Sequence, residues 1–113
     1  MTALSPAFPL TWSSETLGGT RTVLVAVEGE LDRHTAPALC DHLQWLLAGG
    51  PTRLILDTAA VSFADIGAFG VLSDIGRAAR SRGCDVVVAA AGPSLRRLVG
   101  ILGEPAGVTL ESW

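Results

Sequence analysis

The stretch from Arg53 to Gly70 constrains the fold more than any other part of the chain. It begins with an apolar run that ends at Asp57, and after a short turn a second acid, Asp65, precedes glycines and a helical pattern. This order predicts a strand that feeds a helix through a tight loop. The helix N-terminus is then directed at solvent, where a protein can be recognised or modified. Because the loop carries no complete catalytic set, the pattern favours a protein that is bound by another protein over one that transforms a substrate.

Strands and helices alternate along the rest of the chain. Thr22–Glu28 is rich in valine and nearly unbroken in apolar character, which predicts a central strand buried on both faces. Leucines recur at helical spacing after Thr35, the expected N-cap, and Pro37 suits a first helical turn. The other expected elements are short strands at Leu10–Ser13 and Val108–Leu110, a turn at Ser14–Thr20, strands at Arg53–Asp57 and Asp85–Ala91, a helix from about Ile66 to Arg82, and a helix opened by Gly92–Ser94 whose Leu95, Leu98, Val99 and Leu102 face inward.

This alternation predicts an α/β fold with a mostly parallel sheet and right-handed crossovers. We expect a single small domain over residues 1–113, built on a mixed, mostly parallel sheet of four to five strands with the helices mainly on one face. Residues 1–9 are expected to form a loose lead-in, since Pro6 and Pro9 are both unsuited to a regular element.

Charge and hydropathy exclude several classes of function. Apolar residues make up 49% of the 113 residues and charged residues 17%, which favours a packed globule. The formal net charge is −3 and the arginines are scattered, so we expect no nucleic-acid binding. The N-terminal segment lacks the basic and long apolar regions of a secretory signal, and no apolar stretch reaches the roughly 20 residues that span a bilayer. We therefore expect a cytoplasmic protein that does not insert into membranes.

The reactive side chains assemble no catalytic or metal-binding set. Cys40 and Cys84 lie far apart, form no CxxC motif and are expected as small core residues with reduced thiols. His34 and His42 lack a serine or cysteine partner at any recognisable spacing. The glycines form neither a GK[ST] nor a GxGxxG phosphate loop. We expect no enzyme activity, no metal and no cofactor; an enzyme would need a deep pocket lined by His34 and Asp65.

Three motifs give the chain a resemblance to the STAS domain family, the module of bacterial anti-sigma factor antagonists. Their order and spacing together are specific, and they cover the chain from about Val23 to Gly103. They are Glu28–Asp32 with Thr35–Pro37, similar to the family's GELD…TAP segment; Leu54–Asp57 with Val61–Asp65 and Gly70–Leu72, similar to its strand, D-S-S-G loop and following helix; and Arg82–Gly83 with Gly92–Ser94 and Arg96–Leu98, similar to its closing strand and helix.

The resemblance implies a function in transcription regulation by partner switching. Domains of this family bind an anti-sigma factor of the serine-kinase type and displace the sigma factor that it holds. The kinase then phosphorylates the second serine of the D-S-S-G loop, which breaks the complex. A phosphoryl group at that position adds nearly two negative charges at an interface and at a helix N-terminus.

The chain departs from the family at this loop. Counted from Asp65, the D-S-S-G positions hold Asp65, Ile66, Gly67 and Ala68, so Gly67 stands where the resemblance implies the phosphoacceptor serine. Glycine has no hydroxyl, and no phosphorylation is expected there. Gly67 is also expected to let the loop turn tightly into the helix. Ser62 and Thr58 are alternative acceptors on the same loop, against ordinary turn and capping roles.

The expected working surface is the carboxyl end of the two central strands plus the first half of the second helix. Its predicted partner-binding residues are Asp32, Thr35, Ser62, Asp65, Ile66, Gly67 and Phe69. Asp32 either belongs to a shared acidic contact surface or fixes the turn into the next helix. Asp57 is expected to end its strand and hold the loop by local hydrogen bonds. Trp45 is either a contact anchor or a residue packed over the helix end.

Two arrangements of the function stay open. The leading one is a monomer or weak homodimer that binds its partner by surface complementarity. The alternative is a non-switching scaffold or accessory subunit of a signalling or transport assembly, which self-association through Trp12, Trp45 or Trp113 would favour.

Overall fold

The computed structural model describes residues 3–4 and 10–111. Strands and helices alternate over these residues as expected. The elements are β1 (Ala3–Leu4), β2 (Leu10–Leu17), β3 (Thr22–Leu31), α1 (Ala36–Ala48), β4 (Arg53–Ala64), α2 (Ile66–Ser81), β5 (Asp85–Ala89), α3 (Pro93–Leu102) and β6 (Val108–Glu111). Of the expected lead-in over residues 1–9, only β1 is described, and the rest of that stretch lies outside the described residues.

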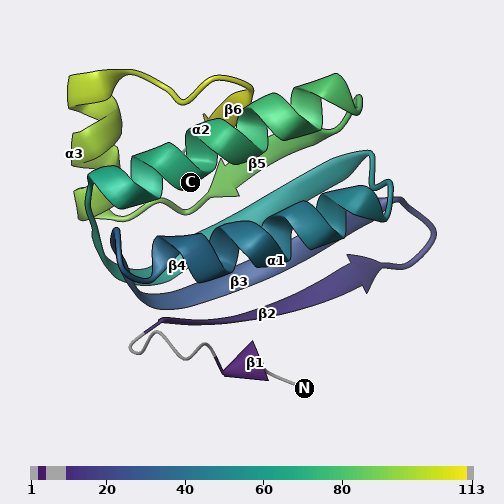
Figure 1. Ribbon diagram of the computed structural model, residues 1–113, viewed down its shortest axis with the longest axis horizontal. Coiled ribbons are helices and arrows are strands. Elements are labelled where there is room, and N and C mark those ends of the chain that lie inside the picture. Colours follow the sequence, from purple (N-terminus) through teal and green to yellow (C-terminus); the bar gives the residue numbers. More distant parts are fainter. Residues whose placement is uncertain (1–2, 5–9, 112–113) are drawn as a thin grey trace.

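The strands form one sheet in the order β1-β2-β3-β4-β5-β6. The pairs β1–β2 and β2–β3 are antiparallel, and the pairs from β3 to β6 are parallel. Helices α1 and α2 lie side by side over one face, and α3 stands at one end of the sheet (Figure 1). The expected single α/β domain with a mixed, mostly parallel sheet is confirmed; the two-residue β1 adds one strand beyond the five expected.

The core lies between the sheet and the helix layer. On β3 the side chains alternate: Val23, Val25 and Val27 are buried, whereas Leu24 is half-buried and Ala26 is exposed. The prediction that this strand is buried on both faces is therefore wrong, because α1 and α2 cover only one face of it. The helices contribute a stripe of fully buried side chains that includes Leu39, Leu43, Leu47, Leu72 and Ile75.

The strands run further than their apolar character indicates. The prediction of a loop over 58–64 is wrong, since β4 continues to Ala64 alongside β3, which supplies its backbone partners. Asp57 does not end the strand. Its Oδ1 accepts a hydrogen bond from Ala59 N (3.0 Å) close to a break in the β3–β4 register. Likewise β2 extends to Leu17, through much of the segment expected as a turn.

The helix limits agree closely with the sequence pattern. α1 and α2 begin directly after Thr35 and Asp65, as expected. In α3 Leu95 is buried, but Leu102 is exposed, so the expectation that it faces inward is wrong. No helix in the described part of the chain is long and apolar enough to cross a membrane.

Candidate functional site

The predicted site residues gather where β3 and β4 end side by side. Leu31 pairs with Ala64 at the last position of both strands, and Asp65 N donates to Leu31 O (3.2 Å). From this edge the chain enters α1 through residues 32–35 and α2 through Asp65. The N-termini of α1 and α2 consequently lie at the same end of the sheet (left in Figure 1).

Asp32 organises the turn into α1. Its Oδ1 accepts hydrogen bonds from His34 N (2.8 Å) and Thr35 N (3.0 Å). Both bonds favour the charged form of the Asp32 carboxyl and so lower its pKa below the ordinary value. The bond from Thr35 N has the largest effect, and that from His34 N the next largest. Of the two roles that the sequence leaves open, the structure therefore shows the turn-fixing one.

Thr35 holds the same turn through its buried side chain. It holds the N-cap position of α1, as expected, but its side chain makes no capping bond. Instead its Oγ1 accepts from Asp32 N (2.9 Å) and donates to Glu30 O (2.8 Å). The residue is 2% exposed, so it shapes the surface without reaching it.

Asp65 caps α2, and Gly67 lies against the turn that Asp32 organises. Asp65 Oδ1 accepts from Gly67 N (2.7 Å), which satisfies one of the amides at the helix start. A Cβ atom at Gly67 would lie 2.5 Å from both Cα and N of Arg33 and 2.9 Å from the Asp32 carbonyl carbon. Glycine is required here by this close backbone approach between the α1 and α2 entrances.

Apolar side chains flank Asp65 and Gly67 in the sequence. Ile66 is 59% exposed, Phe63 is 48% exposed and Phe69 is half-buried. Phe63 is not among the predicted partner-binding residues. The sequence could have indicated it, because an aromatic residue two positions before a helix cap, in a segment predicted as a loop, is a candidate for an exposed anchor. We name Phe63, Asp65, Ile66 and Phe69 the α2 N-terminal surface.

The two alternative hydroxyls differ in access. Thr58 is 2% exposed and its Oγ1 donates to Ala89 O (3.1 Å), so it is closed to a kinase. Ser62 is exposed on β4, and its Oγ donates to Gly29 O (3.3 Å). Of the two, only Ser62 lies where a kinase can reach it.

Of the two histidines, His34 lies in the turn into α1 at this edge, where its backbone N–H donates to Asp32. In residues 3–4 and 10–111, no group of three His, Cys, Asp or Glu side chains could hold a metal ion. Burial raises the pKa of the Cys40 and Cys84 thiols, which disfavours the reactive thiolate. His42 lies between the rings of Trp12 and Trp45, and burial lowers its pKa.

Comparison with known proteins identifies the sequence family. The family model described as "Mlab, STAS domain" matches residues 18–104. No curated protein sequence matches the chain.

Solved structures share the fold. An anti-sigma factor antagonist from Mycobacterium paratuberculosis is 28% identical, with a TM-score of 0.77 over 94% of this chain and 90% of that one. The Bacillus cell fate determinant SpoIIAA in its phosphorylated form is 19% identical, with a TM-score of 0.68 over 89% and 91%. An anti-sigma factor antagonist STAS domain from Rhodobacter sphaeroides is 18% identical, with a TM-score of 0.59 over 72% and 86%.

Proposed function

This chain belongs to the STAS domain family, and we propose that it is a non-enzymatic interaction module that binds a serine-kinase anti-sigma factor in a partner-switching pathway. Three observations support the proposal: the match to the family over residues 18–104, the anti-sigma factor antagonists among its structural neighbours, and the α2 N-terminal surface. The surface carries most of the argument, because it exposes two large apolar side chains, Phe63 and Ile66, close in sequence to the carboxylate of Asp65.

Such a surface suits recognition by another protein. Apolar anchors next to a partly buried charge are typical of the residues that dominate binding energy at interfaces. Asp32 and Thr35 act beneath it by holding the turn, and Asp65 caps α2 while offering its second carboxylate oxygen to a partner cation. Ser62, Ile66, Gly67 and Phe69 complete the proposed contact area.

The proposed complex is not broken by phosphorylation at the family site. Gly67 has no hydroxyl, and the Arg33 backbone leaves no room there for a side chain. The same observation favours a second candidate function, a non-switching scaffold or accessory subunit of a signalling or transport assembly.

Affinity capture from the native cells distinguishes the two. Tagged wild-type chain is used as bait, next to Ile66→Asp and a matched control, Ile101→Asp, which changes an exposed isoleucine on α3. Recovery of an ATP-binding, kinase-like anti-sigma factor by the wild type and the control, but not by Ile66→Asp, is the expected result. Recovery of transporter subunits or of a large multi-copy assembly instead supports the accessory role.

A further inference from the structure

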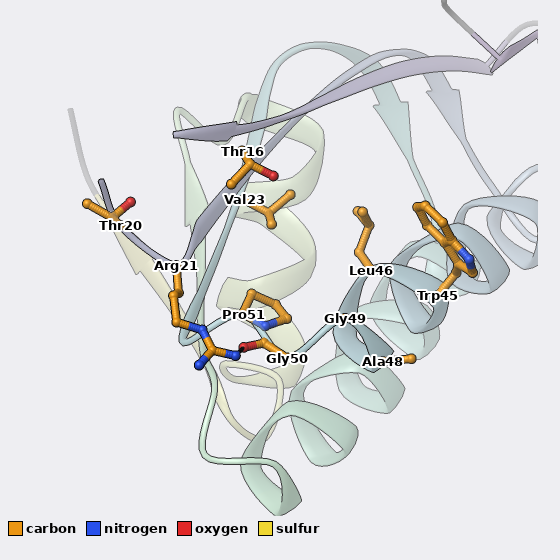
Figure 2. A pocket seen from close by; sticks show the side chains of 10 residues that line it. All are labelled: Thr16, Thr20, Arg21, Val23, Trp45, Leu46, Ala48, Gly49, Gly50 and Pro51. Atoms are coloured by element: carbon orange, nitrogen blue, oxygen red, sulfur yellow. Dashed lines mark hydrogen bonds between the residues drawn. The ribbon is translucent and has the colours of Figure 1, made fainter. Parts of the chain in front are cut away.

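A groove lies at the other end of α1 from the α2 N-terminal surface. It encloses about 500 Å³ between the last turn of α1 and the start of β3. Figure 2 shows Trp45 and Leu46 on its α1 side, Arg21 on the opposite side, and Val23 and Pro51 between them. α1 has 13 residues, so about 20 Å separates the groove from the proposed partner site.

The groove exists because the side chains at the end of β2 do not pack against the last turn of α1. Alternate residues of a strand share a face, so Ser14 and Thr16 follow Trp12 on the side that faces α1. Trp12 is buried there, whereas the two smaller polar side chains are exposed and leave space under Trp45.

Trp45 is held as a preformed anchor. Its side chain is 71% exposed, yet its ring stacks on His42 with centroids 6.0 Å apart. His42 in turn packs on Trp12 with centroids 5.6 Å apart. A tryptophan whose ring already stacks on a neighbouring ring loses little conformational entropy on binding. This property is typical of an interface anchor.

The charge of the groove selects its occupant. Among residues 10–111, Arg21 is the one charged side chain that lines it. Its guanidinium donates to Gly50 O, and the ion pairs found among the described residues involve Arg53 and Arg77 instead. A guanidinium at one end of an apolar groove complements a carboxylate on the ligand.

We propose that the groove binds an extended segment of another protein that carries an aliphatic residue and an acidic residue. The segment lies in the groove itself, between the last turn of α1 and Thr16 of β2. Its aliphatic side chain enters the space between Trp45 and Val23, and its carboxylate pairs with Arg21. Burial of the aliphatic side chain against Trp45 supplies affinity, and the ion pair with Arg21 supplies selectivity. This inference is independent of the proposed function, because the two surfaces lie at opposite ends of α1.

Selection from a phage-displayed library of short random peptides tests it. Peptides enriched on the wild-type chain are synthesised, and their affinities are measured by fluorescence anisotropy. We expect them to share an aliphatic and an acidic residue and to lose at least about tenfold in affinity with Trp45→Ala, Arg21→Glu and Thr16→Arg. Arg97→Glu, at an exposed α3 position, and Ile66→Asp should leave their affinity unchanged. Thermal melts establish that each variant is folded.

Three results would overturn the inference. The first is the absence of any enriched peptide. The second is enriched peptides whose affinity is indifferent to Trp45→Ala, Arg21→Glu and Thr16→Arg. The third is a wild-type dimer in sedimentation that Trp45→Ala converts to a monomer, because a second copy would then occupy the groove.

Discussion

A Cβ atom at Gly67 would lie 2.5 Å from the Cα of Arg33, closer than two such atoms can approach. The obstacle is backbone, so no change of the Arg33 side chain relieves it. The entrances of α1 and α2 are therefore packed together at the one position where the family resemblance implies a phosphoacceptor serine.

The first prediction is that Gly67→Ala destabilises the fold by about 1–3 kcal/mol, since the added methyl group overpacks a backbone contact. Gly70→Ala is the matched control. Gly70 is also in α2, and a Cβ atom added there would meet open space within 4 Å, so alanine should stabilise the helix by up to about 1 kcal/mol. Urea denaturation measures both. Equal stabilities for the two variants would mean that the close approach is absent in solution.

The second prediction separates the role of Asp65 as the N-cap of α2 from the role of its negative charge in partner binding. Asp65→Ala should cost about 1 kcal/mol of stability, because Gly67 N loses its side-chain acceptor. Asp65→Asn keeps an acceptor oxygen and should retain most of that stability while binding the partner more weakly. Thermal melts and calorimetric titration with the captured partner measure the two effects. Unchanged affinity in Asp65→Asn would remove the carboxylate from the contact surface.

The third prediction concerns the buried hydroxyl under the turn. Thr35→Val should destabilise the chain by about 1–3 kcal/mol, because Asp32 N and Glu30 O both lose a hydrogen-bond partner. Thr52→Val, at an exposed site with only a 3.4 Å contact to Arg21 O, should change stability little. Guanidinium denaturation compares them. A loss in Thr52→Val as large as in Thr35→Val would show that the cost comes from threonine replacement in general.

The fourth prediction is a pH dependence that comes from His42. Burial lowers its pKa in the folded chain below the ordinary value of 6.5, so the unfolded chain binds the proton more readily. The contribution to stability is complete above pH 6.5 and is lost as the pH falls from there through the lowered pKa. Asp32 also has a lowered pKa, but its contribution begins to be lost only as the pH approaches 3.8.

Melting temperatures between pH 7.5 and 5 measure this effect. His42→Phe keeps an aromatic ring between Trp12 and Trp45 and should flatten the profile. His34→Gln, at an exposed position, is the control and should leave the profile as in the wild type. A profile that stays the same in His42→Phe would assign the dependence to other groups.

The helices could be predicted well and the strand ends could not. Thr35 and Asp65 mark the starts of α1 and α2 because capping chemistry is local in sequence. The continuation of β4 through Thr58–Ala64 depends instead on β3, which pairs with it from more than thirty positions earlier. Thr58, Val61 and Phe63 favour a strand, but the alanines and Ser62 between them interrupt the apolar run, so pairing with β3 decides the conformation.

The sequence could predict that the candidate site residues lie at one edge of the sheet but not what they contact, and their role in partner binding stays a prediction. Asp65 and Ile66 are partly or largely exposed beside α2, as a surface site requires. The packing of Gly67 on Arg33, and the burial of Thr35, depend on how two turns meet in space. Phe63 was not included in the predicted site because the extension of β4 to Ala64 was not predicted.

Native mass spectrometry of this chain with its captured anti-sigma factor, before and after addition of Mg²⁺ and ATP, tests the central claim most directly. The account predicts a complex that persists after ATP and a chain whose mass is unchanged, with Ile66→Asp failing to form the complex. A phosphorylated chain that dissociates from its partner would contradict it and would direct attention to Ser62, the accessible hydroxyl beside the α2 N-terminal surface.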